Sequence, residues 1–147
     1  MRSCYIFDID GTLANNKHRV HHLEKTPKDW DAYHADYEKD VPFDHMCRTA
    51  HMIAGHYTVI FCTGRPEYQR RGTLKWLYHN VTANLEKCLY MRKDGDHRPD
   101  HIVKLELLEQ IRLDGLDPIM AFDDRNSVVK MWRDAGIPCA QVAEGDF

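Results

Sequence analysis

Five short apolar runs, separated by longer amphipathic segments, constrain the fold of this chain more than any other feature. The runs are rich in branched and aromatic residues and cover residues 4–9, 57–62, 87–91, 118–122 and 138–142. Most of them are continuously apolar, as strands buried on both faces of a sheet are. Alternation of such strands with helical segments is typical of a parallel sheet wrapped by helices. We therefore expect an α/β, doubly wound, Rossmann-like fold with about five strands.

The length and composition of the chain favour one compact domain over residues 1–147. With 147 residues, 43% of them apolar, the chain can bury one core but not two of full size. It has no apolar stretch long enough to cross a membrane, so we expect no membrane partner. The formal net charge of −3 argues against coating nucleic acid by bulk electrostatics, and any polyanion must be held locally.

The N-terminus and the cysteines indicate a cytoplasmic protein. The first three residues lead directly into an apolar run, without the extended apolar segment and cleavage site of a signal peptide. The five cysteines are an odd number without CxxC spacing, and three lie in strand-like runs. We expect reduced thiols in the core rather than disulfides.

Residues 15–42 interrupt the alternation and predict a small helical insertion or partial lid after the first strand. A threonine, a proline and an acid at residues 26–29 indicate a helix start capped by Thr26. Trp30, Tyr33 and Tyr37 follow at helical spacing, and packing on the domain is favoured over base stacking. The basic residues at 17–22 form either a solvated loop, the favoured interpretation, or a basic rim that contacts a nucleic-acid backbone.

Polar residues gather where the predicted strands end, which is where parallel sheets bind their ligands. The first strand leads into Asp8-Ile9-Asp10-Gly11-Thr12, the second into Thr63-Gly64-Arg65, and the fourth into Asp123-Asp124-Arg125, while Lys104 lies in the helix before the fourth strand. Carboxylates brought together repel one another, and burial adds a desolvation cost. A divalent cation would compensate both effects.

The order of these motifs resembles the haloacid dehalogenase superfamily of aspartate-nucleophile phosphatases. Its four motifs are DxDGT, a Ser or Thr at a strand end, a Lys or Arg, and an acidic pair, and all four are present here in order. Residues 91–104 and 123–147 further resemble the phosphatase domain of bacteriophage polynucleotide kinase/phosphatase. The chain contains no GxxxxGK[ST] loop, so we do not expect it to phosphorylate 5′ ends.

The resemblance implies catalytic roles for four residues. Asp8 would attack phosphorus and form an aspartyl-phosphate. Asp10 would protonate the leaving oxygen and then activate water. Thr63 and Lys104 would stabilise the charge on the transferring phosphoryl group.

The resemblance also implies a Mg²⁺ site and a set of substrate contacts. Asp8, Asp123 and the carbonyl of Asp10 would bind Mg²⁺ together with phosphate and water, with Asp124 acting through a bound water. Candidates for substrate binding are Thr12, which also fits a turn cap, Gly64, Arg65 and Arg125.

The expected function is removal of 3′-phosphates from polynucleotide ends, because the short insertion leaves an open site and the resemblance is to a polynucleotide enzyme. The alternative substrate is a nucleoside monophosphate. A receiver-like phosphoacceptor module is the alternative from another class, since receivers also arrange Asp, Thr and Lys around Mg²⁺. Its acidic pair follows the first strand, however, whereas the adjacent pair here follows the fourth.

Overall fold

The computed structural model describes residues 1–85 and 87–147 and contains all five predicted strands in one parallel sheet. The sheet order is β5-β4-β1-β6-β7, with the first strand at the centre. The strands are β1 (Arg2–Phe7), β4 (Thr58–Pro66), β5 (Leu89–Arg92), β6 (Leu116–Asp123) and β7 (Cys139–Gln141). The expected α/β fold is confirmed.

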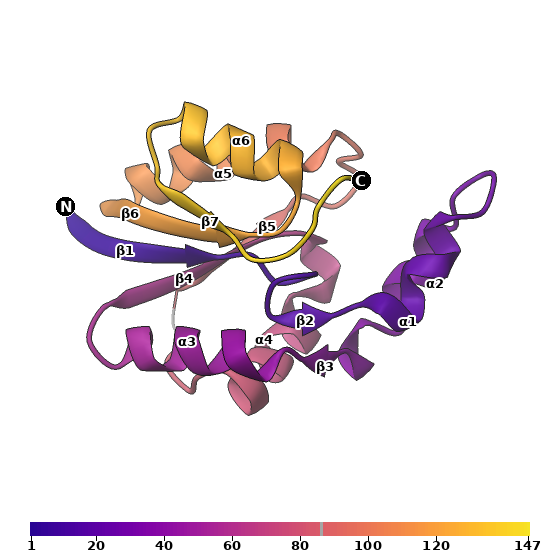
Figure 1. Ribbon diagram of the computed structural model, residues 1–147, viewed down its shortest axis with the longest axis horizontal. Helices are drawn as coiled ribbons and strands as arrows, with labels where there is room; N and C mark the ends of the chain where they lie inside the picture. The colour runs from indigo at the N-terminus through magenta and orange to yellow at the C-terminus, as the bar shows by residue number, and fades with distance from the viewer. Residues whose placement is uncertain (86) are drawn as a thin grey trace.

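Helices cover both faces of the sheet. Figure 1 shows one face covered by α3 (Asp44–Ala54) and α4 (Arg70–Asn80), and the other by α5 (Asp100–Leu113) and α6 (Asn126–Asp134). The central strand is accordingly buried on both sides, with Ile6 and Phe7 essentially inaccessible to solvent. This explains why its sequence is continuously apolar.

Helix α5 buries a different face from the one that its leucines suggest. Ile102 and Leu105 are 39% and 44% exposed, whereas Leu108 is buried. The buried residues of the helix are Val103, Lys104, Leu108 and Ile111. Because the buried Lys104 lies on the inner face, that face cannot be recognised in the sequence as a continuous apolar stripe.

The insertion is framed by a two-residue antiparallel pair, β2 (Ala14–Asn15) and β3 (Val41–Pro42). Between these strands lie α1 (Lys17–Val20), η1 (His21–Leu23), α2 (Trp30–Ala35) and η2 (Tyr37–Lys39). Figure 1 shows α1 and α2 standing beyond the carboxyl ends of the central strands. The part of the chain that the structure describes contains no large cap.

The start of α2 differs from the prediction. The cap is Asp29, whose Oδ1 accepts a hydrogen bond from the backbone N–H of Ala32 at 3.0 Å, and not Thr26. Both residue types cap helices well. The helix begins three residues later than expected, so the acid expected in its first turn is the cap.

All five cysteines are buried and free, as expected for core thiols. Within residues 1–85 and 87–147, the helices lack the length and hydropathy that a membrane span requires.

Candidate active site

Asp8 lies directly after β1, 6% exposed, at the carboxyl edge of the sheet. Its backbone N–H donates to the carbonyl of Phe122 at 3.0 Å, and its Oδ2 accepts a hydrogen bond from the Thr12 hydroxyl at 3.1 Å. Gly11 makes the turn between them possible, because it has a φ of +84° and a Cβ there would lie 2.1 Å from Oδ2 of Asp124. The DxDGT motif thus builds a rigid turn against the acidic pair.

Three carboxylates converge at this edge because β1 and β6 are neighbours in the sheet. Oxygens of Asp8, Asp123 and Asp124 all lie within 4.8 Å of one another. Burial and the charge of Asp123 raise the pKa of Asp8 well above its ordinary value and that of Asp124 to about 6. The site therefore holds more negative charge than its surroundings neutralise.

Lys104 is the cation that the structure places among these carboxylates. It projects from α5, is 2% exposed, and its Nζ donates to Oδ1 of Asp8 at 2.7 Å and to Oδ2 of Asp123 at 2.9 Å. Burial alone would lower the pKa of Lys104, but Asp123 and Asp8 outweigh burial and raise it. The lysine stays charged and links the first motif to the last.

The donor set fits a divalent cation. One ammonium faces three buried carboxylates, and oxygen ligands of this kind are those that Mg²⁺ prefers. Asp8, Asp123 and Asp124 would hold the ion, which when bound neutralises charge on a phosphoryl group. The side chain of Asp10 is not part of this cluster.

Asp10 instead faces two arginines. Its carboxylate accepts hydrogen bonds from Nη2 of Arg65 at 2.7 Å and from Nη2 of Arg19 at 2.6 Å. Burial alone would raise the pKa of Asp10, but the charges of Arg65 and Arg19 outweigh it and hold that pKa well below its usual range. The carboxylate is ionised and fixed in direction.

Asp40 completes this arrangement from the far end of the insertion. It is 4% exposed. Its carboxylate accepts hydrogen bonds from Nε of Arg19 at 2.8 Å, from Nη2 of Arg19 at 2.6 Å and from Nη2 of Arg65 at 3.1 Å. His18 Nε2 also lies 2.7 Å from Asp40 Oδ1. One buried carboxylate therefore holds both arginines that face Asp10.

Sequence analysis missed Arg19 and Asp40 as site residues. The favoured interpretation of residues 17–22 as a solvated loop is wrong for Arg19, which is 1% exposed. The aromatic stripe offered one signal: Tyr33 packs on Arg19, with the guanidinium carbon 4.3 Å from the ring centroid. The predicted packing of the stripe holds for the buried Tyr33 but not for Trp30, which is 48% exposed, and the contact with a buried arginine was not predicted.

The Thr63-Gly64-Arg65 motif lies inside β4 and not after it. The pairing of β4 with β5 becomes irregular between Thr63 and Pro66, so the strand continues beyond its apolar run. Thr63 is 1% exposed, and its Oγ1 accepts from the backbone N–H of Arg65 at 3.1 Å. The Thr63 hydroxyl hydrogen remains available to a phosphate oxygen.

Gly64 and Arg125 meet at Asp100. A Cβ on Gly64 would lie 2.5 Å from Oδ1 of Asp100, so glycine permits this close approach. Asp100 also accepts from Arg92 NH2 and, at 3.2 Å, from Arg125 NH1. Arg125 is further tied to the carbonyl of Phe147 at 2.9 Å. The Arg125 side chain therefore lies at the rim of the site and contacts Asp100 and Phe147.

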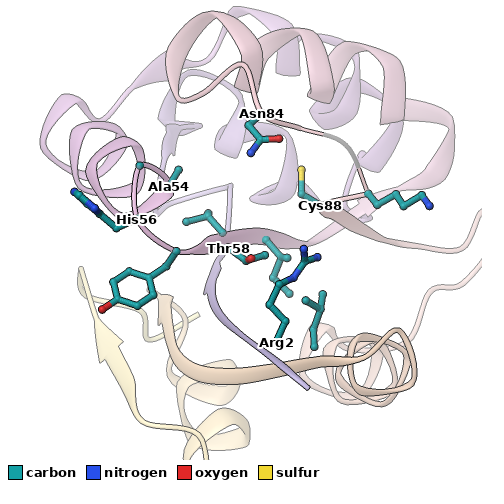
Figure 2. A pocket seen from close by; sticks show the side chains of 12 residues that line it. Arg2, Ala54, His56, Thr58, Asn84 and Cys88 are labelled. Atoms are coloured by element: carbon teal, nitrogen blue, oxygen red, sulfur yellow. The ribbon is translucent and has the colours of Figure 1, made fainter.

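A separate pocket lies at the opposite, amino-terminal edge of the sheet. Figure 2 shows it between the starts of β1 and β4, with Arg2, His56, Thr58 and Asn84 around it. None of its 12 lining residues is a carboxylate or a candidate site residue. It is distinct from the acidic site.

The doubly wound sheet, with Asp8, Thr63, Lys104 and the acidic pair gathered at its carboxyl edge, defines a haloacid dehalogenase-type phosphatase domain. The family model of the polynucleotide kinase PNKP phosphatase domain matches residues 2–147, and the chain belongs to this family. Membership in a phosphatase family argues against the receiver-like alternative.

Relatives of known structure agree with this assignment. Two solved structures of the Pnkp1/Rnl/Hen1 complex, one of them described as an RNA repair complex, contain similar chains. They match 100% of this chain at 30% and 29% identity, with TM-scores of 0.82 and 0.81, and cover 47% and 44% of those chains. A haloacid dehalogenase-like hydrolase from Streptococcus pneumoniae shares the fold, with a TM-score of 0.63 at 11% identity over 95% of this chain and 83% of that one.

A protein of Autographa californica nuclear polyhedrosis virus, named as a bifunctional polynucleotide kinase/RNA ligase, is 28% identical over 131 residues. The match covers 89% of this chain and 18% of the viral protein. The chain thus spans less than half the length of these polynucleotide relatives.

Proposed function

We propose that this phosphatase domain removes 3′-phosphates from polynucleotide ends, in a Mg²⁺-dependent reaction through an aspartyl-phosphate on Asp8. The observation that carries the proposal is the buried contact of Asp8 with Lys104 beside Asp123 and Asp124, in a member of the polynucleotide kinase phosphatase family. Relatives named for polynucleotide kinase, RNA ligase and RNA repair support end healing as the context.

In the first step a carboxylate oxygen of Asp8 attacks phosphorus and the bond from phosphorus to the 3′ oxygen breaks. Lys104 and the Thr63 hydroxyl stabilise the negative charge on the equatorial oxygens. An incoming phosphate gives Arg65 a third anionic partner beside Asp10 and Asp40, and the added negative charge raises the pKa of the Asp10 carboxyl. Asp10 can then take up a proton from solvent and deliver it to the departing 3′ oxygen.

In the second step water attacks the phosphorus of the aspartyl-phosphate, so that inorganic phosphate leaves and Asp8 is restored. Asp10, now ionised, accepts the proton of that water. The two arginines and Asp40 keep the Asp10 carboxylate in one orientation through both steps.

The absence of a large cap from the described residues suits a substrate that extends away from the site. When the 3′ end of a polynucleotide is bound, the rest of the strand must extend out of the site in the 5′ direction. A small monoester, in contrast, can be enclosed completely. The insertion lies beside the carboxyl edge of the sheet (Figure 1).

The test is phosphate release from a 3′-phosphorylated oligonucleotide in Mg²⁺, beside a 5′-phosphorylated oligonucleotide and nucleoside monophosphates. We expect release from the 3′ end and a loss of at least ~10³-fold in kcat for Asp8→Asn. Asp146→Asn, a change to an exposed carboxylate near the C-terminus, is the control and should retain activity.

Faster turnover of the mononucleotides would replace the polynucleotide assignment with a nucleotidase and leave the aspartate mechanism standing. Full activity of Asp8→Asn would contradict the mechanism itself.

A further inference from the structure

Two large aromatic side chains remain exposed on the insertion side of the site. Trp30 on α2 is 48% exposed, and Tyr68 on η3 (Glu67–Gln69) is 64% exposed. His34 lies between them, with its ring centroid 5.9 Å from Trp30 and 6.4 Å from Tyr68. We call Trp30, His34 and Tyr68 the aromatic row. Exposed aromatic groups gathered in this way are characteristic of binding surfaces.

The aromatic row bridges the insertion and the body of the domain. The side-chain amide of Gln69 donates to the backbone carbonyl of His34 at 3.2 Å, which holds η3 against α2. Trp30 and Tyr68 are therefore fixed relative to each other although they are 38 positions apart in the chain. A ligand on the row meets a preformed surface and loses less binding free energy to ordering it.

The aromatic row is continuous with the catalytic site. The Trp30 ring lies 5.8 Å from that of Tyr33, which packs at 4.3 Å on the guanidinium of Arg19. Arg19 in turn donates to Asp10 at 2.6 Å. His34 is also near enough to Asp10, Arg19 and Arg65 for their charges to act on its pKa. Tyr33 and Arg19 therefore connect the row to Asp10.

The charge around the row suits a nucleotide at its Trp30 end. The ammonium of Lys28 lies 5.8 Å from the Trp30 ring centroid. At the other end, Asp94 Oδ1 accepts from the backbone N–H of Tyr68 at 2.9 Å, so its charge is partly satisfied. Burial lowers the pKa of His34, so its ring is neutral at pH 7 and can stack without added charge. A base can stack on Trp30 while the Lys28 ammonium forms an ion pair with the neighbouring phosphate.

We propose that the aromatic row is a stacking subsite for an unpaired base next to the 3′-phosphate, which makes single-stranded ends the substrates of this domain. The inference rests on the proposed function and adds the element that distinguishes a polynucleotide from other monoesters. Paired bases hide their faces in the duplex, whereas single strands offer them to aromatic side chains.

The first experiment compares Trp30→Ala and Tyr68→Ala with the unmodified protein on a short single-stranded 3′-phosphorylated oligonucleotide. We expect KM to rise about tenfold for Trp30→Ala and less for Tyr68→Ala, with kcat within about twofold, because stacking contributes to binding and not to the chemical step. Trp30→Phe should recover most of the affinity. Rates on p-nitrophenyl phosphate, which has no base, should not change.

Tyr78→Ala is the matched control, since Tyr78 is an equally exposed tyrosine at 58% and lies near the end of α4 that leads away from the site. It should leave KM for the oligonucleotide unchanged. An equal KM in Trp30→Ala and the unmodified protein would overturn the subsite. So would a dimer that Trp30→Ala converts to a monomer without a change in KM, because the row would then be a self-association face.

A binding measurement separates this inference from the proposed function. In an Asp8→Asn background, quenching of tryptophan fluorescence by the same oligonucleotide reports stacking without turnover. Quenching that is lost in Trp30→Ala would support the subsite even if the unmodified protein released no 3′-phosphate. Absence of quenching and of any affinity change would reject it, whatever the enzyme hydrolyses.

Discussion

At the residue scale, the site depends on the balance between buried charges. Lys104 compensates for two of the three converging carboxylates, and it is almost completely removed from water. A buried ion pair adds little net stability, but removal of one partner leaves an uncompensated charge and is costly. Removal of Lys104 would therefore leave Asp8 and Asp123 without their buried cation.

We predict that Lys104→Met destabilises the metal-free protein by about 3–5 kcal/mol, because Asp8 and Asp123 lose their cation. Mg²⁺ should restore part of this stability but not the turnover. Chemical denaturation with and without Mg²⁺ measures both effects. Lys130→Met, which removes a 75% exposed side chain from α6, should cost about 0.5 kcal/mol or less. Equal losses in the two variants would contradict the buried role.

Stability without Mg²⁺ should fall as the pH rises from about 4 to 6. The pKa of Asp124 is raised to about 6 by burial and Asp123, so the folded protein retains a proton that the unfolded chain loses near pH 4. The contribution is present below pH 4 and is lost as the pH rises through about 6. Mg²⁺ should thus raise Tm strongly at pH 7 and little at pH 4, as thermal unfolding would show.

Asp124→Asn should flatten the pH dependence without Mg²⁺ and weaken the response to Mg²⁺. A Tm increase of the same size at both pH values would argue against this carboxylate cluster as the metal site.

At the scale of elements, the insertion contributes side chains to the candidate site, among them Arg19 and Asp40. Its two ends are paired as β2 and β3, and the indole N–H of Trp76 on α4 donates to the Asp40 carbonyl at 2.8 Å. These contacts bring Asp40 to the arginines that face Asp10. The insertion therefore helps to hold the arginines that fix the direction of the Asp10 carboxylate.

We predict that Asp40→Asn lowers kcat at least about tenfold, since Arg19 and Arg65 lose a shared anionic partner and their hold on Asp10 shifts. Stability should fall by about 2–4 kcal/mol, because two buried arginines are less well compensated. Steady-state kinetics and thermal unfolding test this. Asp36→Asn, in the same insertion but paired with the exposed Lys39, should change neither. Normal kinetics for Asp40→Asn would remove the orienting role.

At the scale of the whole molecule, the doubly wound sheet buries all five thiols in one core. Burial raises the pKa of Cys62 to about 12 and those of Cys4, Cys47 and Cys88 to about 11. Thiols react as thiolates, so these groups are doubly protected, by low ionisation and by lack of access.

We predict that iodoacetamide at pH 8 leaves the folded protein unmodified over times in which the denatured chain reacts at all five thiols. Intact-mass spectrometry counts the added groups. Because the raised pKa values keep the folded thiols neutral, stability should hold up to about pH 9 and decline as the pH rises toward 11. Rapid alkylation of one thiol at pH 8 would show that its part of the core opens.

Most of the fold could be predicted from the sequence, because strands buried on both faces must be apolar throughout. The five strands were found, with ends displaced by a few residues where pairing outlasts the apolar run, as at Thr63 to Pro66. The inner face of α5 does not follow from apolar periodicity alone, since the buried Lys104 lies on it beside Val103, Leu108 and Ile111. The candidate site residues were recognisable because their motifs occur in a fixed order, most of them at or near strand ends.

By itself, the sequence determined the fold class and the candidate site residues Asp8, Lys104 and the acidic pair, because strand patterning and short motifs are local properties of the chain. Only the tertiary structure decided that Arg19 and Asp40 join the site and that Trp30 and Tyr68 share one surface. Some of these contacts join residues that are distant in the chain, such as Arg65 with Asp40 and His34 with Tyr68. No periodicity marks such pairs, because burial of a charged side chain depends on partners that the fold alone brings within hydrogen-bonding distance.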